Sequence, residues 1–369
     1  MTVKPELWKG RRTWVLDNGK LSLRVMAGGG HLAELIHEGR PDVNPYWVPP
    51  WRWMEPWEYG PRRDAERYGG SRLLASIAGH NICLGVFGPG SDDEIRAGGA
   101  ECHGDAPTTR WRPVRKRVTR QRVRFTCACN LPNERMRVER TLTMRAGSDV
   151  VRVRERFWNL AKKDVPYTMC EHVTFGPPFL EKGVTLFDMS AEAGHTFPEP
   201  FGEVQRFRTD TPFEWPRGPG RHGRPVDMRT IGSRVKASSD FTSQLMDRSQ
   251  PHAWFSAVNP RQGLLVTYVW NRTDFPWLGN WEENRGRGTA PWNNRTLTRG
   301  MEFANSPFPL SLRDQVDLGT FQGERTYRWL PARASTEVRY AIVVRAVEES
   351  CRGVADVAPA GSGFRIQLL

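Results

Sequence analysis

Short runs of apolar or alternating residues recur from one end of this chain to the other, and each is bounded by Gly, Pro, Asn or Asp. Examples are LSLRVMAGG, RVRFTCAC, VVRVRERFWNL and VRYAIVVRAV. An apolar residue at every second position places one face of a strand in a core, whereas the spacing of an amphipathic helix is scarce in this sequence. The chain is therefore predicted to be all-β.

Three local features refine this prediction. Residues 134–160 form two long alternating runs around AGSD, where Gly147 can adopt positive φ, so we expect a hairpin. The one helix expected is short and lies in EYGPRRDAERYGG, with Pro61 in its first turn. Residues 197–250 are rich in Pro, Gly, Arg and Ser, and we expect them to be long excursions from a β scaffold.

The length of 369 residues allows one large all-β domain or two ordinary ones. No low-complexity linker, fixed-period repeat or clean shift in composition divides the chain. We therefore expect a single domain over residues 1–369, built as a broad antiparallel β-sandwich with a concave face.

The sequence predicts a cytoplasmic protein without a membrane partner. No run of 18 or more apolar residues occurs, and the first thirty residues lack the apolar stretch of a signal peptide. The six cysteines form no CxxC pair or zinc spacing. Cys127 and Cys129 lie two apart on an expected strand, so they are interpreted as reduced thiols on one buried face.

The net charge of +13 raises the question of a nucleic-acid partner. The densest basic run, residues 112–125, is interrupted by Val114, Val118, Val123 and Phe125, as in a half-buried strand. The other arginines are dispersed and no nucleic-acid motif is present, so we expect no nucleic acid as partner. The planar donor fork of arginine also suits carboxylate or hydroxyl-rich ligands.

The chain has fifteen tryptophans, and two clusters of them lie in residues 46–59 and 270–284, next to Pro and Gly. Core packing accounts for most such rings. Exposed indole faces beside Arg, Asp and Asn also stack on sugars while polar side chains hold the hydroxyls. Trp281 is the candidate platform of the second cluster.

The segment GGAECHGDAPTTRW, residues 98–111, places Glu101, His103 and Asp105 at alternate positions. The surrounding Gly, Ala, Pro and Thr favour a surface loop, and the alternative is an extended chain in which these groups share one face and form a site. Oxygen ligands with one imidazole would suit Mn²⁺, Zn²⁺ or Ca²⁺, but a metal is the lesser alternative and none is predicted.

Several segments in order resemble the galactose mutarotase-like superfamily of aldose 1-epimerases and their relatives. These are VLDNGKLSLRVMAGGGHLAELIHEGRPDVNPYW, YGGSRLL, CHGDAPTTRW, YTMCEHVTFGPPF and GMEFANSPFPL. The resemblance covers most of the chain and implies the large β-sandwich, or supersandwich, of that superfamily. The sequence departs from the family where VTFGPPF replaces an aromatic–Asn pair, and Asp227 or Asp240 stands for its mid-chain aspartate.

The resemblance implies an acid–base mechanism that needs no metal or nucleotide cofactor. Glu302 would be the base, His172 the acid, and His103 would stabilise charge near the ring oxygen of a sugar. Arg72 would hold hydroxyl groups.

The residues alone leave alternatives open. His172 lies between apolar neighbours and also fits a core histidine, whereas an inward-facing Glu302 is costly unless it has a partner or a chemical role. Asp105 and Arg110 are further candidates for substrate binding, although Arg110 can instead pair with Asp105 or Glu101.

Three functions are compatible with the sequence. The first is an aldose 1-epimerase, which interconverts the anomers of a sugar. The second is a carbohydrate-binding domain without catalysis. The third is another carbohydrate enzyme on the same scaffold, such as a lyase, an isomerase or a hydrolase. In each case the expected partner is a sugar or a sugar derivative.

Overall fold

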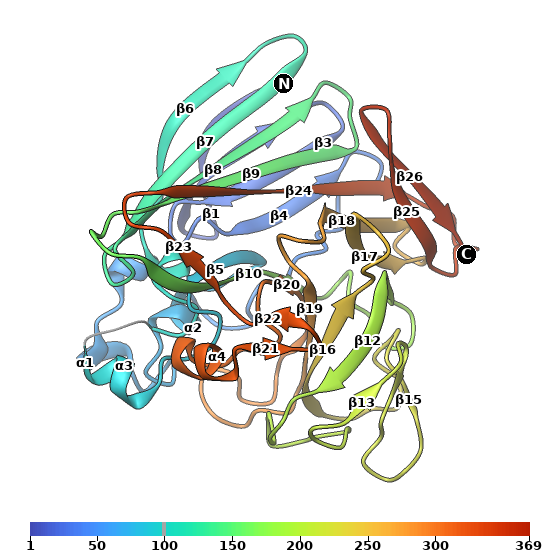
Figure 1. Ribbon diagram of the computed structural model, residues 1–369. Coiled ribbons are helices and arrows are strands. Elements are labelled where there is room, and N and C mark those ends of the chain that lie inside the picture. The colour runs from blue at the N-terminus through green and yellow to red at the C-terminus, as the bar shows by residue number, and fades with distance from the viewer. Residues whose placement is uncertain (98–100) are drawn as a thin grey trace.

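The computed structural model describes residues 1–97 and 101–369 and consists mainly of antiparallel strands (Figure 1). The all-β prediction is confirmed. The large 12-stranded sheet runs in the order β1 (Thr2–Trp8), β2 (Arg11–Asp17), β3 (Leu21–Met26), β4 (Leu32–His37), β5 (His80–Gly85), β10 (Val165–Phe175), β20 (Leu297–Ala304), β19 (Trp277–Asn284), β16 (Ser238–Met246), β12 (Ala191–Thr196) and β13 (Pro212–Phe213), while β23 (Arg328–Leu330) pairs with β10.

An 8-stranded sheet forms the second layer. Its order is β11 (Leu186–Met189), β17 (His252–Asn259), β18 (Leu264–Asn271), β24 (Ser335–Ala346), β9 (Val150–Asn159), β8 (Met136–Arg145), β7 (Arg122–Leu131) and β6 (Arg112–Val118). Three strand pairs lie outside the two sheets: β14 (Arg217–Gly218) with β15 (Val226–Asp227), β21 (Thr320–Phe321) with β22 (Glu324–Arg325), and β25 (Val354–Ala360) with β26 (Gly363–Leu368).

The helices are short and gather at the lower left of Figure 1. They are α1 (Pro61–Asp64), α2 (Arg72–Ser76), α3 (Asp92–Arg96) and α4 (Leu312–Leu318), with 3-10 turns at Pro56–Glu58 and Ala106–Thr108. The expected short helix is α1, with Pro61 at its start. In the part of the chain that the structure describes, no helix is long and apolar enough to cross a membrane.

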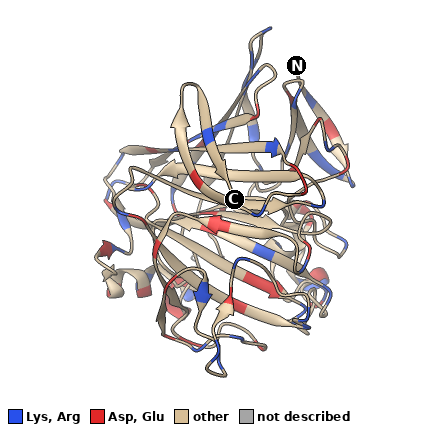
Figure 2. Cartoon of the chain, turned by 90° about the vertical axis from the view of Figure 1, so that its right-hand side faces the viewer, with Lys and Arg blue, Asp and Glu red and all other residues tan. Residues whose placement is uncertain are grey.

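The main hydrophobic core lies between the two sheets and draws side chains from both. Strand β9 shows how alternation builds it, because Val151, Val153 and Phe157 are buried whereas Arg152 and Arg156 are exposed. Charged segments of both signs are spread over the side of the molecule that faces the viewer in Figure 2. The alternating pattern thus places the arginines on the outer face of the strand and the apolar residues on the face that meets the core.

Most strand predictions are confirmed in detail. Strands β8 and β9 pair antiparallel as the expected hairpin, and Gly147 in their turn has a φ of 63°. Cys127 and Cys129 are both buried on β7. The prediction for residues 197–250 is wrong at its end, because Ser238–Met246 forms β16, a fully buried strand of the large sheet. Its Ser, Thr and Gln side chains concealed the usual apolar alternation.

His31 is a buried histidine that helps hold the edge of this core. Its Nδ1 accepts a hydrogen bond from the Ala78 N–H at 3.1 Å, and its Nε2 lies 2.9 Å from the carbonyl oxygen of Pro107. A carbonyl only accepts, so Nε2 carries the proton and the ring is neutral. Burial lowers the pKa of His31 to about 3.

Protonation of His31 should therefore destabilise the fold as the pH falls. The unfolded chain binds this proton below about pH 6.5 while the folded protein does not, so stability is lost as the pH drops from there. Between about pH 6.5 and 5, wild type should lose about 1.6 kcal/mol more unfolding free energy than His31→Gln. Urea denaturation at the two pH values measures this difference, and equal losses in the two proteins would contradict the assignment.

Candidate active site

Two neighbouring strands of the large sheet bring an imidazole and a carboxylate into contact. In the antiparallel register of β10 and β20, His172 lies directly opposite Glu302. The Nε2 atom of His172 is 3.1 Å from Oε1 of Glu302. The adjacent residues Glu171 and Phe303 point to the opposite side, into the main core. Glu171 therefore faces away from His172.

The surroundings favour an uncharged pair. Both side chains are buried, and burial lowers the pKa of His172 well below its ordinary value while raising that of Glu302 well above its own. Thr174, two residues along the same face, has its Oγ1 2.9 Å from Nδ1 of His172. This contact fixes the orientation of the ring, so that Nε2 faces the carboxylate.

His103 approaches the pair from a turn before the 3-10 segment Ala106–Thr108. Its φ of 70° and that of Gly104, 75°, are both in the left-handed region, which turns the imidazole back over the sheet. Nδ1 donates to the carbonyl oxygen of Phe87, and the ring centroid is 5.1 Å from that of His172. Burial disfavours a charged ring, but the sulfurs of Cys102 and Cys83 outweigh it and raise the pKa of His103.

These groups open onto one cavity of about 300 Å³ on the face of the large sheet that points away from the main core. The three catalytic candidates His103, His172 and Glu302 all line it. The other lining residues are mostly apolar: Ser71, Leu73, Leu74, Ile77, Gly88, Pro89, Cys102, Phe201, Phe241, Trp281, Arg287, Trp292 and Pro309.

Trp281 stands beside the acid–base pair, with its ring 5.7 Å from that of His172. The missing side chain of Gly300, which is opposite Trp281 across β19 and β20, makes room for it. A Cβ at Gly300 would lie 2.4 Å from Oε1 of Glu302 and 3.1 Å from the indole. The absence of a side chain at Gly300 therefore lets Glu302 and Trp281 take these positions.

Arg287 is the arginine that lines this cavity. Its guanidinium carbon lies 5.7 Å from the ring centre of Trp281 and 5.1 Å from that of Trp292. Its Nε is 3.1 Å from a carboxylate oxygen of Glu283, which also accepts from Ser239 at 2.7 Å. The guanidinium is thus held in place by an acid and two rings, and its remaining donors can bind a ligand.

The other predicted substrate-binding residues do not line the cavity described above. Arg72 begins α2 and lies 3.5 Å from Glu101 in a half-exposed ion pair. Asp105 accepts from the backbone and side-chain amides of Asn133 at 2.8 and 2.9 Å. Arg110 stacks over the ring of Trp57, 4.9 Å from its centre.

Of the two possibilities for Glu101, His103 and Asp105, the structure shows the loop and not the extended strand. Residues 102 and 103 form a turn, so Glu101, His103 and Asp105 point in three directions rather than one. Residues 98–100, which open the segment, lie outside the described residues. Within the described residues no three His, Cys, Asp or Glu side chains come together as metal ligands, so the alternative metal site does not fit these residues.

Neither candidate for the mid-chain aspartate reaches the cavity. Asp240 is buried beside Arg206, with a contact of 3.1 Å from Nε, and burial raises its pKa to about 6. Asp227 accepts from the backbone N–H of Arg229 at 2.9 Å. Both have local structural partners.

Sequence reasoning missed Arg287 and Thr174. Thr174 had a usable signal, because it is two residues from His172 on an expected strand and so shares its face. Arg287 had a signal too, because it is the one arginine of the sequence between two glycines and it lies between Trp281 and Trp292. The position of its guanidinium over both rings is seen only in the folded chain.

Solved structures share this fold. A candidate aldose 1-epimerase from Klebsiella pneumoniae superposes with a TM-score of 0.67 at 14% identity, covering 94% of this chain and 84% of that protein. A galactose mutarotase-like protein from Clostridium acetobutylicum gives 0.61 at 12% identity, covering 94% and 99%. A candidate aldose 1-epimerase from Escherichia coli K12 gives 0.57 at 13% identity, covering 91% and 99%.

The chain therefore has the galactose mutarotase-like fold, as the resemblance predicted. No family model matches the sequence. No curated protein matches it either. At these identities the likeness concerns the fold alone.

A methyl group at Gly300 should disturb the site measurably. Gly300→Ala forces Glu302 and Trp281 to move, and such crowding should cost about 1–3 kcal/mol of unfolding free energy. The matched control is Gly363→Ala on β26, where the nearest atom is 4.0 Å from the added Cβ and the change should stay within about 0.5 kcal/mol. Urea denaturation followed by circular dichroism compares the two, and equal stability would contradict the crowding.

Proposed function

We propose that this protein binds a sugar in the cavity and interconverts its anomers by acid–base catalysis, as aldose 1-epimerases do. The observation that carries the proposal is the 3.1 Å contact between His172 and Glu302 in a cavity that also holds His103. An acid and a base side by side can act on two oxygens of the same hemiacetal.

The proposed reaction moves two protons and breaks one bond. Glu302 accepts the proton of the anomeric hydroxyl while His172 donates a proton to the ring oxygen, and the bond between that oxygen and the anomeric carbon breaks. The open aldehyde rotates about its neighbouring carbon–carbon bond. The reverse transfers then close the ring on the other face, so the enzyme returns to its starting state.

The pair must share one proton for this cycle. In the empty cavity, burial favours the uncharged form, with the proton on Glu302 and a neutral His172. Hydrogen bonds from the sugar to the carboxylate favour the charged form, so binding would move the proton across the 3.1 Å contact to His172. A cationic His103 would further stabilise the carboxylate.

The remaining cavity residues fit a single sugar ring. Trp281 lines the cavity with the part of its indole that its neighbours leave uncovered, and Arg287 offers donors for neighbouring hydroxyls. Arg72, Asp105 and Arg110 have partners elsewhere, so we assign the hydroxyl-binding role to Arg287 in their place.

The acid–base groups also favour an epimerase over a hydrolase. Glycoside hydrolysis ordinarily uses two carboxylates across the bond that breaks. Among residues 1–97 and 101–369, Glu302 is the only carboxylate in the lining of the cavity. A binding domain without catalysis would use the same cavity, and activity measurements separate that alternative.

Removal of the base should abolish most catalysis while sparing binding. Glu302→Gln keeps the shape of the side chain but loses the proton acceptor, so epimerisation should fall by at least about a hundredfold. The amide still forms hydrogen bonds, so sugar affinity should change much less. Polarimetry of freshly dissolved anomers, with the spontaneous rate subtracted, measures the effect. The wild-type rate should follow a bell-shaped pH profile that belongs to the coupled pair.

His172→Asn should lose activity in the same way. His103→Asn tests which of the two histidines is the proton donor. If His103 were the proton donor, its loss would abolish the rate while His172→Asn retained it. Unchanged rates in both the Glu302 and His172 variants would refute the mechanism. A wild type that binds sugars without accelerating mutarotation would identify a binding domain.

Trp281 should report sugar binding directly. Trp281→Ala removes the stacking face and should weaken binding by about 1–3 kcal/mol, while Trp281→Phe should retain part of it. Intrinsic fluorescence titration over a panel of mono- and oligosaccharides measures the affinities. The control is Trp57→Ala, which alters an exposed ring outside the cavity lining. Equal losses in the Trp281 and Trp57 variants would refute a stacking role.

A further inference from the structure

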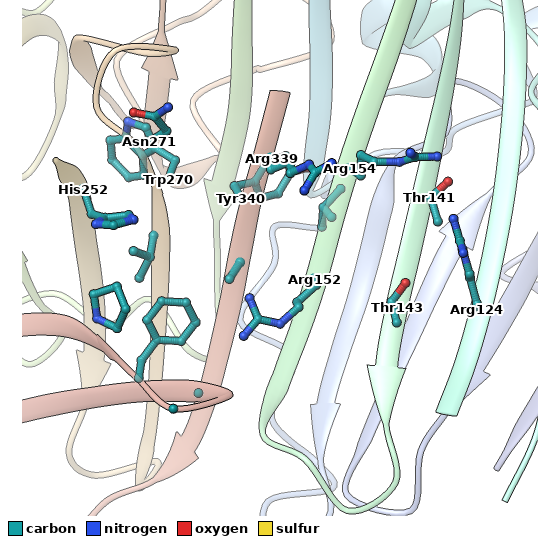
Figure 3. A pocket seen from close by; sticks show the side chains of 17 residues that line it. Arg124, Thr141, Thr143, Arg152, Arg154, His252, Trp270, Asn271, Arg339 and Tyr340 are labelled. Carbon is teal, nitrogen blue, oxygen red and sulfur yellow. The ribbon is translucent and has the colours of Figure 1, made fainter. Parts of the chain in front are cut away.

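A second hollow lies on the outer face of the 8-stranded sheet, under the C-terminal hairpin of β25 and β26 (Figure 3). It has a volume of about 580 Å³. Its lining contains four arginines and no carboxylate among the described residues: Arg124, Thr141, Thr143, Arg152, Val153, Arg154, His252, Val269, Trp270, Asn271, Arg339, Tyr340, Ala341, Pro359, Gly361, Gly363 and Phe364.

The sheet register concentrates the positive charge in this groove. Arg154 on β9 is directly opposite Arg339 on β24, although like charges at such positions repel each other. Arg152 shares the outer face of β9 with Arg154. Thr143 on β8 lies opposite Arg152 on one side and opposite Arg124 of β7 on the other. Figure 3 shows the arginines spread over neighbouring strands of one surface.

The carboxylates nearby neutralise only part of this charge. Glu337 is shared, at 3.3 Å from Arg154 and 2.6 Å from Arg339. Neither Arg124 nor Arg152 has an acidic partner among the residues that the structure describes, and the Nε atom of Arg124 is buried without a hydrogen bond. The groove therefore keeps an excess of cations that an anion would relieve.

The hairpin holds one of these arginines in position. Arg152 donates to the carbonyl oxygen of Ser362 at 2.6 Å, and its guanidinium carbon lies 5.7 Å from the ring centre of Phe364. Its mobility is thus reduced before any ligand binds, which lowers the entropy cost of binding. The basic strand β6 extends the surface, since Arg117 lies opposite Arg124.

We propose that this groove binds an acidic saccharide chain through its carboxylate or sulfate groups. Guanidinium forks match such groups in two-point contacts, and Thr143 and Asn271 add polar groups for hydroxyls. Nucleic acid fits less well, because Trp270 and Tyr340 are buried beneath the surface and Arg152 lies over Phe364, which leaves no open ring for bases. The proposal does not depend on the function of the cavity.

The test measures binding of fluorescent oligogalacturonate and of a heparin oligosaccharide to the full chain by anisotropy. Both should bind at low salt and weaken as salt rises from about 50 to about 500 mM. Preference for one probe identifies carboxylate or sulfate as the group recognised.

The double variant Arg124→Gln and Arg152→Gln should raise the Kd at least about tenfold. Neither arginine pairs with a carboxylate in the described part of the chain, so the two substitutions leave no carboxylate there without its partner.

The control double variant, Arg62→Gln and Arg67→Gln, removes the same charge from exposed positions outside the groove and should change Kd less than about twofold. Circular dichroism verifies folding, and Arg152→Lys, which keeps the charge but not the fork, should retain part of the affinity. Three outcomes would overturn the proposal: no binding of either probe, equal losses in both double variants, or tighter binding of single-stranded DNA at the same sites.

Discussion

The register between β10 and β20 is the constraint on which the rest of this structure depends. It sets His172 opposite Glu302, and it sends the alternate residues Glu171 and Phe303 to the other side of the sheet. Because side chains alternate with a period of two, a slip of one residue would exchange the two faces along the whole strand. The acid–base pair would then lie in the core. The same pairing therefore determines both how the sandwich packs and which face carries His172 and Glu302.

A buried polar network beneath the pair stabilises this register. Glu171 lies 2.7 Å from Nε2 of His80 and accepts from the hydroxyl of Tyr340 at 3.0 Å. Arg140, from the other sheet, contacts Glu155 and approaches Glu171 at 3.7 Å. All of these groups are buried, so a shifted strand would leave them unpaired in apolar surroundings at a cost of several kcal/mol. The network thus disfavours alternative strand pairings more than it adds to overall stability.

The sequence was sufficient for the strands with clear alternation and for the order of His103, His172 and Glu302, because these depend on local pattern and on a recognisable arrangement of motifs. It was insufficient where tertiary contacts decide the local structure. Strand β16 is buried on both faces with Ser, Thr and Gln, and its hydrogen-bond partners come from distant strands. The turn at His103 depends on a backbone conformation that glycine usually supplies. Arg287 lies between Trp281 and Trp292 in the sequence, but the path of the loop between β19 and β20, which turns its guanidinium over both rings, is not encoded by a periodic pattern.

Part of the high arginine content is explained by buried arginines with structural roles, which the net charge of the whole chain does not distinguish from surface arginines. Arg11, Arg140 and Arg299 are buried, and each donates to a backbone carbonyl oxygen at 2.6 Å. A guanidinium can satisfy several acceptors at once in a core, whereas a lysine ammonium is a compact, strongly hydrated charge that is harder to bury. The net charge of +13 thus includes arginines whose roles lie inside the sandwich. Charge becomes informative about a partner only where a surface holds cations without matching acids, and the groove that contains Arg124 and Arg152 satisfies that condition.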